Sequence, residues 1–213
     1  MPSPAPTPDA ERLAEPLRSR WSPSVFDDRH RLTDAEVGDV LEAARWAPSW
    51  GNIQPWAFLL LERGGAGHDV LLDHLSRGNR SWVPQASVVV LAAARIAADP
   101  ADPDDKGVKG EAESCYDLGQ AAAHLTLQAT ALGLAVHQFG GFDKQAVAAR
   151  LGVPGHYRLL TGIALGRHGD PARADADTAA REQRERHRRP VETFIHAGAW
   201  GRGWAPLHSG SVR

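Results

Sequence analysis

Hydrophobic and polar positions along the chain first follow helical spacing. Thr33 and Glu36 have the spacing of a capping box, in which a hydroxyl and a carboxylate take the free amides at a helix start. Apolar residues then recur at helical intervals and predict an amphipathic helix through about Trp46. A second and longer stripe predicts a helix over 111–132 that Gly133 ends. This helix is apolar on most sides, as is typical of a core or interface helix.

Between these helices lie short apolar runs with the length of strands. They cover residues 57–61, 86–94, 134–139 and 159–165. Short helices are predicted over 70–75 and from an Asp143 cap to near Gly152. The polar stretch 95–110, rich in Asp, Pro and Gly, is a candidate lid or a disordered excursion. Strands alternating with helices predict one mixed α/β or α+β domain.

Length and composition place this pattern in an ordinary globular chain. The 213 residues suffice for one domain, which we assign to 16–213 after a disordered Pro-rich tail over 1–15. The net charge of −2 predicts no general attraction to nucleic acid or to an anionic membrane. No apolar run reaches the roughly 18 residues that span a bilayer, and the start does not resemble a signal peptide, so we expect a cytoplasmic protein.

Common cofactor and metal motifs are missing from the sequence. Neither G-x-G-x-x-G nor a Walker A pattern occurs, and neither H-E-x-x-H nor paired C-x-x-C is found. Cys115 has no second cysteine with which to form a disulfide. His187, His196 and His208 lie in a polar tail and are interpreted as solvated, so no metal site is expected.

Five short segments carry the candidate chemistry, and each also has a plainer interpretation. In 18–26, Arg20 and Ser22 are two residues apart and can both address one phosphate, or the segment is a basic surface turn. The loop 47–56, set between prolines, can read the edge of a flat heterocycle, or it is a turn before a strand with Trp56 in the core.

The other three segments are weaker signals taken singly. The segment 78–82 precedes the Val-rich strand, and 137–143 carries two adjacent glycines that permit close backbone approach to a planar ligand, or form a simple turn. The charge run 181–190 is typical of a solvated surface. His137 is interpreted as a neutral, packed histidine.

Taken in order, these segments resemble the FMN-dependent nitroreductase family over residues 18–200. The family's R-x-S-x-R/K-x-F pattern corresponds to 20–26, and its P-S-x-x-N-x-Q-P-W pattern to 48–56. The resemblance implies an α+β sandwich with a central mixed β-sheet flanked by helices. It also implies an intertwined homodimer with FMN at the interface, in which the tail from about 191 embraces the partner.

The resemblance also implies roles for individual residues. Phosphate contacts would come from Arg20 and Ser22 together with Arg186 and Arg188. The loop of the opposite subunit would contact the flavin, Asn79 would bond its pyrimidine edge, and a glycine amide would point at N5. The complete expected cofactor set is Arg20, Trp21, Ser22, Pro48, Ser49, Trp50, Asn52, Asn79, Gly140, Gly141, Arg186 and Arg188.

Two positions depart from the family pattern. Relatives often carry Arg or Lys where this chain has Ser24, and some carry Lys where it has Trp82. A cation near the flavin favours the anionic reduced form, so its loss is expected to make the reduced flavin less stable.

The implied reaction is a ping-pong transfer. Hydride passes from NADH or NADPH through FMN to a nitroaromatic, quinone or similar electron-poor small molecule, and no catalytic side chain is assigned. Two other interpretations stay open: a flavin-dependent dehydrogenase or oxidase that tailors a metabolite, and a non-catalytic FMN-binding protein.

Overall fold

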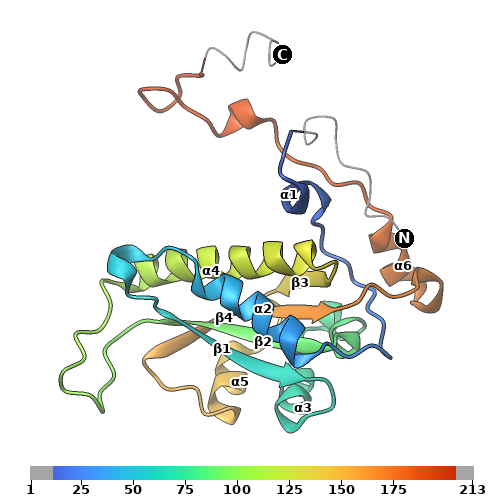
Figure 1. Cartoon of the computed structure of the whole chain (residues 1–213), viewed down its shortest axis with the longest axis horizontal. Coiled ribbons are helices and arrows are strands. Elements are labelled where there is room, and N and C mark those ends of the chain that lie inside the picture. The colour runs from blue at the N-terminus through green and yellow to red at the C-terminus, as the bar shows by residue number, and fades with distance from the viewer. Residues whose placement is uncertain (1–11, 205–213) are drawn as a thin grey trace.

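The computed structural model describes residues 12–204 and contains one four-stranded sheet with helices on both faces (Figure 1). The strands are β1 (Trp56–Glu62), β2 (Val88–Arg95), β3 (Ala135–Phe139) and β4 (Tyr157–Gly166), in the order β1-β2-β4-β3. Each predicted apolar run therefore forms a strand, and no strand end differs from its prediction by more than two residues. Helices packed on an antiparallel sheet confirm the expected α+β class.

The sheet of residues 12–204 is antiparallel rather than mixed as expected, because each of its three strand pairings is antiparallel. Glu62 at the end of β1 pairs with Val88 at the start of β2. The connection between them thus leaves and returns at the same end of the sheet, which forces the two strands to run in opposite directions. Apolar runs locate strands but carry no information on their direction.

The two long helices begin and end where their terminal residues predict. In α2 (Asp34–Arg45) the Thr33 hydroxyl accepts from the Glu36 amide at 3.2 Å, and the Glu36 carboxylate accepts from the Thr33 amide at 2.9 Å. After α4 (Glu111–Ala131), Gly133 has a φ of +69°, in the left-handed region that glycine adopts without strain.

The shorter helices were predicted less well. The predicted capping of α5 (Lys144–Arg150) by Asp143 is confirmed, since its carboxylate accepts from the Ala146 amide at 3.0 Å. The helix expected over 70–75 is α3 (Ala66–Asp73), whose first turn of small and polar residues has no apolar stripe. Neither α1 (Glu15–Ser19) nor α6 (Ala176–Glu182) was predicted. Turns of 3-10 helix lie at Trp50–Asn52, Arg77–Asn79, Val83–Gln85, Pro171–Arg173 and Val191–Thr193.

Strand β2 has buried side chains on both faces and divides the core into two layers. Its residues Val88, Val90 and Ala92 pack with α2 and α4, whereas Val89 and Leu91 pack with α3 and α5 on the opposite face. Figure 1 shows the same arrangement, with one helix pair on each side of the sheet. The predicted packing of the long helix is confirmed in part, because one of its faces belongs to this core.

Two segments project from this core. The loop between β2 and α4 is closed at its base by an ion pair between Arg95 and Asp105. Beyond α6 the chain leaves the sheet as an extended arm (Figure 1), on which Phe194 is 53% and Trp200 is 90% exposed. The proposed tail lies mostly outside the described residues, and α1 begins at its last residue, Glu15. In the described part of the chain, no helix has the length and apolar content to cross a bilayer.

Candidate functional site

The segment 20–26 is held against the sheet by contacts with residues far away in the sequence. The carbonyl of Pro23 lies 2.8 Å from Nδ1 of His137 on β3. Phe26 forms an isolated antiparallel bridge with His168, just after β4. These contacts fix the backbone of the first candidate phosphate segment beside the end of β4.

The four residues expected to bind phosphate come together here. Nη1 of Arg20 donates to the Ser22 hydroxyl at 3.2 Å. Nη1 of Arg186 donates to the carbonyls of Arg18 and Arg20 at 2.8 and 2.9 Å, across 166 residues of sequence in the second case. The pKa of Arg20 is lowered first by burial and then by the charges of Arg188 and Arg186. We call Arg20, Ser22, Arg186 and Arg188 the arginine cluster.

The arginine cluster fits an anionic phosphate. Mutual repulsion between guanidinium groups is unfavourable, and a dianion would relieve it through charge-assisted hydrogen bonds. Nε of Arg186 is buried and has no hydrogen-bond partner in the described part of the chain. A buried donor without a partner is costly, so this atom indicates a place that an acceptor would occupy.

A cavity of about 320 Å³ opens beside the cluster, between α1, α4 and β3. Its polar side is formed by Arg20, Ser22 and Gln138, whose amide Nε2 donates to the Thr126 hydroxyl at 2.8 Å. Its remaining lining is Leu17, Ala123, Leu127 and Val136. Trp21 borders a smaller neighbouring cavity of about 210 Å³. An apolar wall with a few polar groups at one end is typical of a small-molecule site.

The expected Gly140 and Gly141 follow β3, and the expected Asn79, on the 3-10 turn Arg77–Asn79, contacts Gly141. The side-chain amide of Asn79 donates to the Gly141 carbonyl at 3.0 Å, so Asn79 fixes the Gly140–Gly141 turn. A Cβ on Gly141 would collide with the hydroxyl of Ser76 and lie 2.7 Å from Nδ2 of Asn79, whereas a Cβ on Gly140 would meet nothing within 4 Å. Gly140 therefore presents open backbone, while Gly141 is required by packing.

The loop carrying Pro48, Ser49, Trp50 and Asn52 lies elsewhere, against the first half of α4. The amide of Trp50 donates to the buried Asp117 carboxylate at 2.9 Å, and Asn52 has a φ of +57°. With Tyr116, Gln120 and neighbouring residues, this loop lines a separate cavity of about 410 Å³. The Trp50 ring is 52% exposed, and Nζ of Lys109 lies 4.6 Å from its centroid. Within one chain, this loop and the two residues Arg20 and Ser22 line different cavities.

The packed interpretation of His137 agrees with its surroundings. Its ring stacks on Trp82 at 4.2 Å, and its Nδ1 donates to the Pro23 carbonyl. The pKa of His137 is lowered, mainly by burial. Trp82, at a position where some relatives carry Lys, is 2% exposed and also stacks on Phe26. At this position the chain has a core aromatic side chain.

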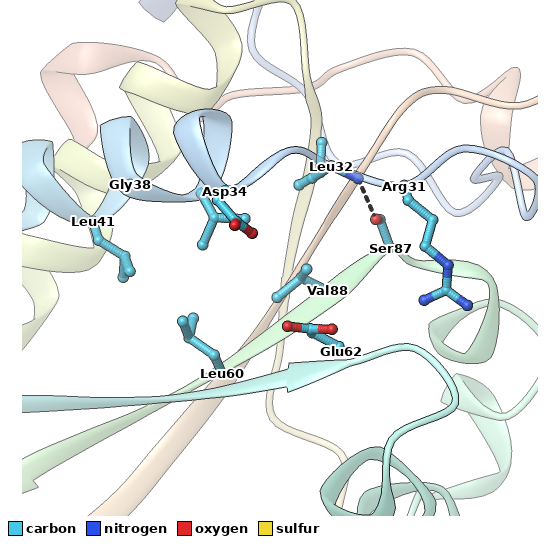
Figure 2. Close-up of a pocket in the computed structure, with 10 residues that line it drawn as sticks. Arg31, Leu32, Asp34, Gly38, Leu41, Leu60, Glu62, Ser87 and Val88 are labelled. Carbon is cyan, nitrogen blue, oxygen red and sulfur yellow. Dashed lines mark hydrogen bonds between the residues drawn. The ribbon is translucent and has the colours of Figure 1, made fainter.

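A third cavity, of about 340 Å³, contains none of the predicted residues. Figure 2 shows it between α2 and the ends of β1 and β2, with Asp34 and Glu62 near its polar end and Leu41 and Leu60 along its apolar side. The Ser87 hydroxyl is engaged there, because it accepts from the Leu32 amide at 2.7 Å. In residues 12–204 no group of three or more His, Cys, Asp and Glu side chains is placed to hold a metal ion.

Sequence reasoning missed the residues that connect these segments. Glu182, on α6, lies in the charge run interpreted as solvated, yet it is 8% exposed and bonds to the amide of Ser24. Asp117 is the one acidic residue among the buried residues of α4, and its carboxylate accepts from the amide of Trp50 in the loop. An isolated acidic residue on the buried face of a predicted helix was the available signal for Asp117.

Comparison with known proteins identifies the class. The chain matches the model of the nitroreductase family over residues 17–167, and it belongs to that family. A solved structure described as an oxidoreductase containing FMN is 28% identical, with a TM-score of 0.79 over 90% of this chain and 95% of that chain.

Two relatives show how far the likeness extends in sequence. An uncharacterised 15.4 kDa protein of Mycolicibacterium smegmatis is 36% identical over 68% of this chain and 97% of its own length. A protein of Streptomyces coelicolor, provisionally named an NADH dehydrogenase/NAD(P)H nitroreductase, is 28% identical over 68% of this chain and 77% of its own.

Proposed function

We propose that this protein is a cytoplasmic, FMN-dependent oxidoreductase that passes hydride from NADH or NADPH to nitroaromatic, quinone or similar electron-poor acceptors. The observation that carries the proposal is the arginine cluster beside the 320 Å³ cavity, including the buried, unpartnered Nε of Arg186. Membership of the nitroreductase family and the likeness to an oxidoreductase containing FMN support it further.

In this proposal two copies of the chain complete each site. One copy supplies the arginine cluster, Asn79 and the Gly140–Gly141 turn, and the second supplies the loop 48–52. Two observations support this division: Arg20 and Ser22 line one cavity of the chain whereas Pro48, Ser49 and Trp50 line another, and Trp50 is half exposed. The exposed arm with Phe194 and Trp200 would embrace the second copy, which makes the homodimer intertwined.

In this mechanism the residues of the chain bind and orient the cofactor and the small molecules that react with it. Arg20, Ser22, Arg186 and Arg188 would hold the phosphate, and the apolar wall of the cavity would exclude water from the ring. Gly140 leaves its backbone open to the ring edge, while Trp50 offers an aromatic face to a flat donor or acceptor. FMN, when bound, supplies the hydride chemistry, and the proposal assigns no side-chain acid or base.

A visible spectrum of the purified protein tests the cofactor and the electron donor. Flavin absorption that bleaches within seconds of anaerobic addition of NADPH or NADH is the expected result. Flavin bands that persist with both nucleotides but bleach with a metabolite would indicate the dehydrogenase alternative. Bands that no reductant of either kind bleaches would indicate an FMN-binding protein, and protein that takes up no FMN would overturn the proposal.

Subunit complementation tests the composite site. An Arg20→Ala chain and a Trp50→Ala chain each form impaired homodimers. In a heterodimer of the two, one site combines both defects, and the other combines Arg20 of one copy with Trp50 of the other. The purified heterodimer should therefore show about half of the wild-type acceptor turnover. Turnover no higher than that of the two mutant homodimers would show that each site is built from a single chain.

A further inference from the structure

Glu182, the last residue of α6, is a buried carboxylate with partners on two other segments. Its side chain is 4% exposed. Oε1 accepts from the backbone amide of Ser24 at 2.5 Å, across 158 residues of sequence. Oε2 lies 2.7 Å from Nε2 of His168, just beyond β4. Burying a carboxylate is costly unless it is paired and hydrogen-bonded, and here both oxygens have a partner.

These bonds attach α6 to the segment that carries half of the arginine cluster. Ser24 is four residues from Arg20, and Glu182 is four residues from Arg186. Other contacts of α6 are weaker: the hydroxyls of Thr178 and Ser81 are 3.4 Å apart, and Arg181 donates to the Gly78 carbonyl at 3.4 Å. Glu182 therefore makes the shortest hydrogen bonds described between α6 and segments distant in sequence.

We propose that Glu182 is a positioning residue that assembles the arginine cluster before the cofactor arrives. With Glu182 fixed on Ser24 and His168, the following residues turn back so that Arg186 reaches the carbonyls of Arg18 and Arg20. Two halves of the cluster, from opposite ends of the chain, are thereby held together despite their like charge. This role for Glu182 rests on the proposed binding of FMN.

The contact with Glu182 also gives Ser24, a position at which the chain departs from the family pattern, a structural role. The family often has a cation at this position, whereas this chain uses the Ser24 backbone amide to hold a carboxylate. Ser24 is itself buried, at 5% exposed, so its amide and the Glu182 carboxylate meet away from solvent. The small residue at 24 and the acidic residue at 182 are thus two parts of one contact.

The sign of the effect separates positioning from simple electrostatics. A carboxylate close to a bound dianion repels it, so if Glu182 acted through its charge alone, its removal would tighten FMN binding. If Glu182 positions Arg186 and Arg188, its removal weakens FMN binding, because the two guanidinium groups then have to be ordered at the moment of binding.

The test is FMN titration of the apoprotein, followed by flavin fluorescence. Glu182→Ala should raise the Kd by about tenfold or more, by analogy with the loss of metal affinity when a residue that orients a metal ligand is removed. Glu182→Gln keeps an acceptor for the Ser24 amide and should raise the Kd by about threefold. The matched control is Glu185→Ala, since Glu185 is three residues away and 87% exposed, and its Kd should stay within about twofold of the wild type.

Hydrogen–deuterium exchange of the apoprotein gives a readout that needs neither FMN nor activity. Both Glu182 variants should exchange faster over 18–26 and 183–189, with α2 unchanged. Unchanged or tighter FMN binding, or unchanged exchange in those two segments, would overturn the role of Glu182. Should Glu182→Ala fail to fold, the milder Glu182→Gln variant decides. If the wild-type protein binds no FMN but both variants still exchange faster in those segments, the proposed function is overturned and the attachment by Glu182 stands.

Discussion

The surroundings of Arg20 and of Trp50 are built in opposite ways. Around Arg20, segments from both ends of the chain converge. Arg186 donates to the Arg20 carbonyl and Glu182 accepts from the Ser24 amide, each across more than 150 residues of sequence. Around Trp50, a short loop is fixed by Asp117 of the adjacent helix, and its aromatic ring remains half exposed. Both regions line open cavities, but Arg20 is joined to a segment far away in sequence, whereas the Trp50 side chain is half exposed.

This difference shows what a single chain can prepare in advance. Like charges and backbone from distant segments are brought together at Arg20 by folding, before any ligand binds. The backbone of Trp50 is fixed by its bond to Asp117, but half of the residue is not covered by any surface in the described part of the chain. Under the proposed function, the first region would bind phosphate within one subunit, and the second would act on the site of a second copy.

The largest expected effect comes from breaking the arginine cluster. Arg20→Ala removes a half-buried guanidinium that would pair with the phosphate, and losing one partner of such a charge pair costs about 2–5 kcal/mol. We expect the Kd for FMN to rise by roughly 100-fold, measured by fluorescence titration of the apoprotein. Arg189→Ala is the control, because Arg189 is exposed and lies over Phe194. Equal affinity in Arg20→Ala and wild type would contradict the assignment of the cluster.

The next largest effect is expected on folding stability, from substitutions in the glycine pair after β3. Gly141→Ala should destabilise the protein by about 1–3 kcal/mol, because its Cβ would meet Ser76 and Asn79. Gly140→Ala has open space around its Cβ and should change the free energy of unfolding by less than about 0.5 kcal/mol. Urea unfolding of both variants measures the contrast. Similar stabilities for the two variants would show that the Asn79 contact does not fix the turn.

Part of the loss of folding stability at low pH should come from His137, which bonds to Pro23 in the segment that carries Arg20. The pKa of His137 is lowered by burial, so the unfolded state takes up a proton first as the pH falls below the ordinary value near 6.5. Stability should be full at pH 7 and decline toward pH 5, by ~1.4 kcal/mol for each unit by which the pKa is lowered.

His137→Phe keeps an aromatic ring against Trp82 and should reduce that decline in urea unfolding series at pH 7, 6 and 5. Part of the decline should remain, because the pKa of the buried His68 is also lowered by burial. His187→Ala is the control, since that side chain is 84% exposed. A decline as steep in His137→Phe as in the wild type would show that His137 does not contribute to the loss of stability at low pH.

The smallest effect is expected at the cation over Trp50. Lys109→Met removes the charge that lies over the Trp50 ring, and the attraction of an exposed cation for an anion contributes about 0.2–1 kcal/mol. We expect kcat/KM for an anionic nitroaromatic such as 4-nitrobenzoate to fall about twofold to fivefold relative to neutral 4-nitrobenzamide. Lys106→Met, in the same loop, should leave this ratio unchanged. An equal ratio in Lys109→Met and wild type would separate Lys109 from acceptor binding.

Local signals predicted the elements of the fold well. The capping box at Thr33, the Asp143 cap and the terminal Gly133 are each readable within a few residues, and each lies at a helix end in the structure. Strand direction and α6 were not predicted. The direction depends on where long connections return, and α6 carries its apolar signal on too few residues, although Asp175 caps it.

The sequence predicted which residues form the candidate site better than it predicted the hydrogen bonds that hold them together. Resemblance to the family named Arg20 and Arg186, and the structure places them together. Glu182 was hidden inside a charged run, because a single sequence does not distinguish a solvated carboxylate from a buried one until its partner, a backbone amide, is known. Backbone partners leave no mark in side-chain patterns.

The ion pair between Arg95 and Asp105 has a consequence for how this protein can evolve. It closes the base of the loop between β2 and α4, and a further ion pair joins Glu111, at the start of α4, to Arg158 on β4. Changes of sequence within the loop are therefore insulated from the sheet. Lys109 reaches the Trp50 cavity from this loop, so exchanging loop sequences can vary what the cavity accepts while the fold is inherited unchanged.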